Sequence, residues 1–183
     1  MPTSKHVIGI TGLMSSGKGT AAHYLKEKYG ASTYTFSTML KDVLSRFYLD
    51  HTRDALVKTS EFIRGTFGED IMAKTMAKDV ESDPSPLIVV EGIRRNADIE
   101  YLKKIPGFQM VEIVADPEIR YQRLIQRTEK ADDQSKTYEQ FLEDHKRSTE
   151  VSILEVAKHA DISIDNNGDE QSLQRQLDKL INT

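Results

Sequence analysis

Cysteine is absent from the 183 residues, which excludes disulfide bonds and thiol chemistry. No apolar run is long enough to span a bilayer, and residues 1–6 are too short and polar for a secretion signal. The five histidines lack the spacing of metal ligands, and the net charge of −4 argues against nonspecific binding of nucleic acid. We therefore expect a cytoplasmic protein with no membrane or nucleic-acid partner. The sequence leaves open whether it is a monomer or a homodimer.

What the sequence does contain is an alternation of short apolar or β-branched runs with segments of helical periodicity. The runs expected to form strands are residues 7–10, 32–36, 87–90, 109–115 and 161–165. Strands separated by helices favour right-handed crossovers, and they predict an α/β fold of three layers, α/β/α, with a five-stranded, mostly parallel, doubly wound sheet. Ligands of such a sheet bind at the carboxyl ends of its strands.

A glycine-rich loop joins the first expected strand to the first expected helix. Its sequence is Gly12-Leu13-Met14-Ser15-Ser16-Gly17-Lys18-Gly19-Thr20. Glycines allow the backbone to curl so that successive N–H groups surround anionic oxygens, and the helix N-terminus adds partial positive charge. The loop therefore predicts a phosphate-binding site formed by Gly12, Ser15, Ser16, Gly17, Lys18, Gly19 and Thr20. The alternative, a flexible glycine turn with an exposed lysine, does not explain the flanking strand and helix.

A single acid follows the third expected strand. Glu91 comes directly after Val90, at the edge where the glycine loop is expected. A carboxylate there can hold magnesium through water, or it can orient a second substrate. The alternative is an ion pair with Arg94 or Arg95.

Arginines recur at helical spacing after Asp116-Pro117, a pair typical of a helix start. Arg120, Arg123 and Arg127 share one helix face. Guanidinium groups stabilise the charge that spreads over a phosphoryl group during its transfer, which makes Arg123 and Arg127 candidate catalytic residues. The alternative is a solvated basic face.

Residues 36–80 form an all-helical insertion between the second and third expected strands, longer than a crossover requires. We expect it to bind a second substrate through Ser37, Arg64 and Arg94. Ser37 is also placed to cap the next helix, and a bend near residues 65–68 can direct Arg64 towards the cleft. A surface role for either arginine is the alternative.

Residues 129–136 are charged and lack an apolar anchor, which predicts a mobile loop. A capping box at residues 137–140 then predicts one long helix that continues towards Lys158. Near the end of the chain, residues 166–168 form a turn after the fifth expected strand.

Together these motifs resemble a P-loop nucleoside-monophosphate kinase over nearly the whole chain. The motifs that carry the resemblance are residues 12–20, 90–94, 115–117 with Arg123 and Arg127, and 164–168. The Gly-Lys-Gly-Thr ending of the loop is similar to adenylate-kinase-related proteins. Other stretches resemble dephospho-CoA-kinase-like proteins and, through Arg64-Gly65-Thr66, deoxynucleoside monophosphate kinases. The loop motif is specific, whereas the motifs on the acceptor side are not.

The resemblance implies a single P-loop kinase domain over residues 1–183, with an acceptor-binding insertion at about 36–80 and a lid at about 127–147. It also implies ATP as phosphoryl donor, bound by the glycine loop, and Mg²⁺ held mostly by phosphates and water. The turn at residues 166–168 is expected near the adenine, with Asn167 as its ATP-binding residue. A small nucleotide is the expected acceptor.

The type of acceptor oxygen is the remaining question. Dephospho-CoA kinases have an aspartate just beyond the second strand, whereas here no acid occurs in residues 33–38. A hydroxyl acceptor benefits from such a base, and a monophosphate acceptor can use Arg64 and Arg94 instead. We therefore favour a nucleoside or deoxynucleoside monophosphate, with dephospho-CoA as the alternative if Glu91 supplies the base. A regulatory protein that binds ATP with little turnover is a further alternative.

Overall fold

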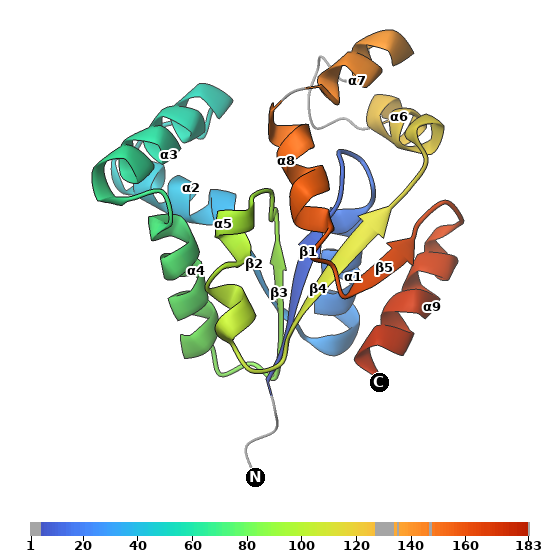
Figure 1. The fold of residues 1–183 in the computed structure, drawn as a ribbon, viewed down its shortest axis with the longest axis horizontal. Helices are drawn as coiled ribbons and strands as arrows, with labels where there is room; N and C mark the ends of the chain where they lie inside the picture. The colour runs from blue at the N-terminus through green and yellow to red at the C-terminus, as the bar shows by residue number, and fades with distance from the viewer. Residues whose placement is uncertain (1–4, 127–133, 135, 147, 183) are drawn as a thin grey trace.

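The structure is a computed structural model that describes residues 5–126, 134, 136–146 and 148–182. Its centre is a five-stranded sheet in the order β2-β3-β1-β4-β5 (Figure 1). All neighbouring strands are parallel. The strands are β1 (His6–Thr11), β2 (Ser32–Thr35), β3 (Leu87–Glu91), β4 (Phe108–Val114) and β5 (Ile162–Asp165). The α/β fold and the strand positions predicted from the sequence are confirmed, and the sheet is parallel throughout.

Helices cover both faces of the sheet and make two cores. On one face, α1 (Lys18–Tyr29) and α9 (Glu170–Ile181) pack through residues such as Leu25 and Leu177 against Ile8 and Ile113. The opposite core is formed by the remaining layer, which comprises α4 (Ile71–Ser82), α5 (Asn96–Ile99), the 3₁₀ helix η1 (Leu102–Lys104) and α8 (Ser148–Ala157). Because helices bury both faces of β1 and β3, the sequences of these two strands are mostly apolar rather than alternating.

The helical insertion contains α2 (Phe36–Arg46), α3 (Arg53–Phe67) and α4. Thr35 caps α2 by accepting a hydrogen bond from Thr38 N, so the prediction that Ser37 caps this helix is wrong. The α3 helix continues past Gly65 and ends before Gly68, whose φ of 107° suits a residue without a side chain. None of the α3 residues is buried. This helix therefore stands beside the sheet rather than within its core (Figure 1).

Two helices replace the long helix expected between residues 138 and 158. The capping box at Thr137 and Gln140 is confirmed, but α7 (Tyr138–Asp144) ends before α8 begins. The sequence analysis also missed α5 and η1, because four- and three-residue helices are too short to show a helical period. The α6 helix (Pro117–Gln126) begins at the expected proline. Arg127 and part of the proposed lid, namely residues 127–133, 135 and 147, lie outside the described residues.

The carboxyl ends of the parallel strands all lie at one edge of the sheet, at the top of Figure 1. The loop between β1 and α1 lies there, with α2 and α3 to one side and α6 and α7 to the other (Figure 1). Among the residues that the structure describes, no helix is both long and apolar enough to cross a membrane.

Candidate active site

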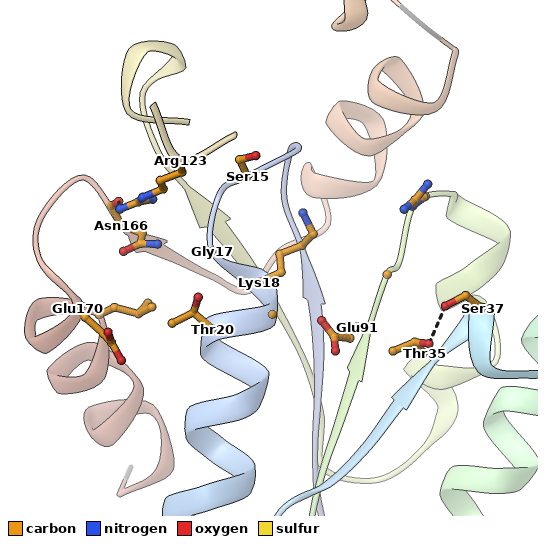
Figure 2. Close-up of a pocket in the computed structure, with 14 residues that line it drawn as sticks. Ser15, Gly17, Lys18, Thr20, Thr35, Ser37, Glu91, Arg123, Asn166 and Glu170 are labelled. Carbon is orange, nitrogen blue, oxygen red and sulfur yellow. Dashed lines mark hydrogen bonds between the residues drawn. The ribbon is translucent and has the colours of Figure 1, made fainter. Parts of the chain in front are cut away.

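A cavity of about 720 Å³ lies at this edge, a size typical of small-molecule sites. The glycine loop supplies one wall together with residues from α6, from α9 and from the segment that follows β5. The other wall is supplied by β2, β3 and the segments that directly follow them, including the start of α2 (Figure 2). Its lining residues are Ser15, Gly17, Lys18, Gly19, Thr20, Thr35, Ser37, Glu91, Gly92, Arg94, Arg123, Asn166, Glu170 and Leu173.

Two glycines allow the loop to take its shape. Gly12 has a φ of 144°, and a Cβ atom there would lie 2.4 Å from the carbonyl oxygen of Ile113. Gly17 has a φ of 105°, and its Cβ would lie 2.1 Å from Nδ2 of Asn166. Both positions therefore exclude a side chain through conformation and through space. The α1 helix begins directly after Gly17, which places its N-terminus at the cavity.

Lys18 is folded back onto the loop. Its ammonium donates hydrogen bonds to the carbonyl oxygens of Gly12 at 2.6 Å and Leu13 at 2.8 Å. Burial lowers the pKa of Lys18 to about 8, against the opposing effect of the Glu150 carboxylate. A desolvated cation at the mouth of a phosphate-binding loop interacts more strongly with a phosphate than an exposed lysine does.

The loop is also held by the segment that follows β5. The buried side chain of Asn166 donates a hydrogen bond from Nδ2 to the carbonyl oxygen of Ser16 at 2.7 Å. The backbone carbonyl oxygen of Asn166 accepts a hydrogen bond from Arg123 at 2.8 Å. Asn166 rather than Asn167 lines the cavity, and the side chain of Asn167 instead accepts a hydrogen bond from Asp116 N. A period of two from the buried Ile164 places residue 166 on the inner face, and this is the signal in the sequence that could have identified it.

Three buried polar atoms around the loop have no hydrogen-bond partner among the described residues. They are Oγ of Ser15, Oγ of Ser16 and Nη1 of Arg123. Buried polar atoms are normally paired, so each of these is available to a ligand. Burial also lowers the pKa of Arg123. Ser15, Arg123 and the hydroxyl of Thr20 border the cavity directly (Figure 2).

Arg120 is buried rather than part of a solvated stripe. It donates to the carbonyl oxygens of Ala115 at 2.9 Å and Met14 at 3.3 Å, and it lies 2.7 Å from Nε2 of His145. Nδ1 of His145 lies 2.8 Å from the Phe141 carbonyl oxygen and donates to it, so Nε2 is the acceptor for Arg120. Arg120 therefore ties the glycine loop to α6 and α7. The sequence analysis placed it with Arg123 on one helix face and did not identify this role.

Glu150 holds the same loop from α8. Its carboxylate accepts a hydrogen bond from the backbone N–H of Met14 at 3.2 Å. Residues from three other elements thus contact the tip of the loop, which restricts its movement.

Glu91 lies across the cavity from the loop, at the end of β3 (Figure 2). Burial raises the pKa of its carboxyl group, and the Lys18 charge partly opposes this shift. No hydrogen bond or ion pair to the Glu91 carboxylate occurs among the described residues. The expected alternative, a salt bridge to Arg94 or Arg95, is therefore not present in the described structure.

The far wall of the cavity carries hydroxyl groups and one arginine. The hydroxyls of Thr35 and Ser37 lie 2.9 Å apart, and Arg94 lines the cavity beside Gly92. Arg64 does not line it, because its guanidinium is directed towards Asp98, at 3.7 Å, and the Glu69 carbonyl. Four further lining residues, Thr35, Gly92, Glu170 and Leu173, were not predicted from the sequence.

A metal at this site has suitable donors. Among the described residues no group of three or more histidine, aspartate or glutamate side chains can hold a metal ion. The Thr20 hydroxyl and the Glu91 carboxylate both line the cavity, so oxygen donors of the type that Mg²⁺ prefers stand beside the loop. This donor set suits a metal held mostly by phosphates and water rather than by the protein.

Residues 8–155 match the AAA domain family, and the chain belongs to that family. A UPF0200 protein of Saccharolobus solfataricus is 28% identical over 178 residues, covering 95% of this chain and 91% of the relative. A UPF0200 protein of Methanothermobacter thermautotrophicus is 25% identical over 176 residues, covering 96% of this chain and 88% of the relative.

Solved structures share the fold at lower identity. Shikimate kinase from Bacteroides thetaiotaomicron superimposes with a TM-score of 0.64 at 16% identity, covering 97% of each chain. TT1252 from Thermus thermophilus gives a TM-score of 0.62 at 19% identity, covering 98% of this chain and 97% of that one. The chain therefore has the α/β fold of P-loop kinases.

Proposed function

Taking this family and fold as the premise, we propose that the protein is an ATP-dependent kinase that transfers a phosphoryl group to a nucleoside or deoxynucleoside monophosphate, giving the diphosphate and ADP. The observation that carries the proposal is the two-sided cavity. A phosphate-binding loop with Lys18 faces a wall that bears Thr35, Ser37, Glu91 and Arg94, so a donor and an acceptor fit on opposite sides. A protein that only binds ATP as a switch does not need the second wall.

The residues divide into donor and acceptor groups. Backbone N–H groups of the loop and Lys18 bind the outer phosphates of ATP, and Arg123 offers its unpartnered Nη1 to the donor. Thr35, Ser37 and Arg94 orient the acceptor. Arg127 stays a prediction as a catalytic residue and Asn167 as an adenine contact. Arg64 does not line the cavity and is not assigned to the acceptor.

When it is bound, Mg²⁺ would neutralise part of the phosphate charge during phosphoryl transfer. Thr20 and, through water, Glu91 are the residues that would hold it. Phosphoryl transfer requires positioning and charge stabilisation more than covalent chemistry, and the site provides fixed donors for both.

The test is a screen of the purified protein with ATP, Mg²⁺ and a panel of nucleoside and deoxynucleoside monophosphates, with ADP as the measured product. We expect turnover with one or a few of these acceptors. ADP formation at the background rate with every acceptor contradicts the enzyme proposal and favours the regulatory alternative.

One observation favours a hydroxyl acceptor as a second candidate. Glu91 is half-buried, its pKa is raised, and it lies beside the acceptor wall, which are properties of a general base. Shikimate kinases have the same fold, so a hydroxyl-bearing acceptor is a reasonable comparison. Competition between dephospho-CoA and the preferred monophosphate, at equal concentration and limiting ATP, separates the two. Preferential phosphorylation of dephospho-CoA would assign Glu91 the role of base.

A further inference from the structure

Arg94 reaches the cavity from a short segment between β3 and α5, and the backbone of this segment is held by one carboxylate. Oδ2 of Asp98 accepts hydrogen bonds from the backbone N–H groups of both Arg94 and Arg95, each at 3.0 Å. Asp98 belongs to α5 and is 3% exposed. Its position therefore determines where the backbone of Arg94 lies.

A charged group from the helical insertion approaches the other oxygen of the same carboxylate. Nη2 of Arg64 lies 3.7 Å from Oδ1 of Asp98, and the two side chains are 10% and 5% exposed. Oδ1 has no hydrogen-bond partner among the described residues, so Arg64 is the cation that balances this buried charge.

Arg64 is itself held in place. Its Nη1 donates to the carbonyl oxygen of Glu69, and its Nε donates to the hydroxyl of Ser60 at 3.4 Å. Ser60 and Arg64 lie one turn apart on α3, and Glu69 follows that helix. The guanidinium therefore joins the end of α3 to α5.

We propose that Arg64 is a positioning residue: through Asp98 it places Arg94 for the acceptor, and it does not itself contact the acceptor. The inference rests on the proposed function only in assuming that the site binds an acceptor. The physical link between Arg64 and the backbone of Arg94 does not depend on it. The link also makes the helical insertion and the acceptor arginine one unit, so a displacement of α3 is passed to Arg94.

A direct contact between Arg64 and the acceptor is the competing explanation. It would require the guanidinium to leave Asp98, which would then remain buried with an unbalanced charge. Arg94, in contrast, already lines the cavity, and its side chain is exposed.

The experiment measures amide hydrogen exchange by NMR, which needs neither activity nor a known acceptor. In Arg64→Ala, we expect exchange at Arg94 and Arg95 to accelerate about tenfold or more, because their acceptor carboxylate loses its counter-ion. Arg64→Lys should restore much of the protection. Lys58→Ala is the matched control, because it removes a positive charge from the same helix at a side chain that is 73% exposed and pairs with Asp54. Exchange at Arg94 and Arg95 unchanged in Arg64→Ala would overturn the proposal.

Faster exchange throughout the protein in Arg64→Ala would indicate global destabilisation. The variant Asp98→Asn then tests whether Arg64 acts on Arg94 and Arg95 through Asp98. This change keeps an oxygen acceptor for both N–H groups and removes the buried charge. If Arg64 acts through Asp98, adding Arg64→Ala to Asp98→Asn changes exchange at Arg94 and Arg95 little. The same acceleration in both backgrounds would contradict the proposal.

Once an acceptor is known, kinetics gives an independent readout. Arg64→Ala and Arg94→Ala should each raise KM for the acceptor with little change in KM for ATP, and the double variant should be no worse than Arg94→Ala alone. If the increases in KM of the two single variants multiply in the double variant, Arg64 contacts the acceptor directly. A nucleotide screen without turnover would contradict the proposed function and leave the exchange result intact.

Discussion

The two walls of the cavity are built differently. On the donor wall, Lys18, Asn166 and Arg120 donate hydrogen bonds to carbonyl oxygens of the glycine loop. Glu150 accepts a hydrogen bond from the backbone N–H of Met14, and all four bonds are buried or partly buried. The acceptor wall carries the exposed side chains of Ser37 and Arg94 and adjoins α3, a helix without a buried residue. The donor wall is therefore pre-organised, whereas the acceptor wall depends on a segment with few core contacts, which is where local opening costs least. The comparison predicts that substitutions in the donor wall have larger effects.

Removal of the Lys18 ammonium should have the largest effect. Lys18→Ala loses a pre-organised contact to the transferred phosphate, which typically costs on the order of 3 kcal/mol, or ~100-fold in rate. Steady-state kinetics with circular dichroism as a control for folding tests this. If activity and melting temperature both match the wild type, the loop does not have the assigned role.

A glycine of the donor wall and a glycine of α3, the helix beside the acceptor wall, should respond oppositely to alanine. In Gly17→Ala, the new Cβ meets Asn166 at 2.1 Å with φ at 105°, so the loop must distort. Strain of about 2 kcal/mol corresponds to ~30-fold weaker ATP binding. Gly65 lies in α3 with nothing within 4 Å of a built Cβ, and Gly65→Ala should stabilise the fold by up to about 1 kcal/mol. Calorimetric titration and thermal melting measure the two effects, and equal responses would contradict the comparison.

ATP binding should weaken as pH rises through the pKa of Lys18. Burial lowers this pKa to about 8, so above that value the free protein loses the charge that binds phosphate. Apparent affinity should be constant below about pH 7 and about tenfold lower at pH 9. Lys18→Ala serves as the control, because its affinity should show no such inflection. The same inflection in Lys18→Ala would assign the titration to another group.

The smallest effect should come from Asp178, which joins α9 to α1 behind the donor wall. Hydrogen bonds from Lys28, Tyr24 and Tyr29 lower the pKa of Asp178 to about 2. A depressed carboxyl pKa stabilises the folded state above the unfolded value near 4, and this contribution is lost as pH falls towards 2. Asp178→Asn should lower the melting temperature slightly at pH 7 and leave it unchanged near pH 2. An equal decrease at both pH values would exclude the ionic contribution.

The acceptor wall shows where reasoning from sequence is insufficient. The sequence analysis assigned Arg64 to the acceptor because it lies beside a bend, but the guanidinium is directed towards Asp98, 34 positions later. Similarly, Asn167 was chosen for the adenine, although the register of β5 directs Asn166 inward. Both outcomes depend on which neighbour a side chain meets, and no local pattern encodes that.

The alternation of strands and helices, the parallel sheet and the glycine loop can all be predicted from the amino-acid sequence, because each depends on residues close together in the chain. Gly12, Gly17 and Lys18 can be identified from a nine-residue motif that forms one turn between a strand and a helix. Two contacts could not be predicted from the sequence and are seen only in the folded chain. Arg120 is buried against Met14, 106 positions away, and Asn166 reaches Ser16, 150 positions away. Such contacts arise from packing of α6 and the β5–α9 segment onto the loop, and their energies depend on burial that only the folded chain provides.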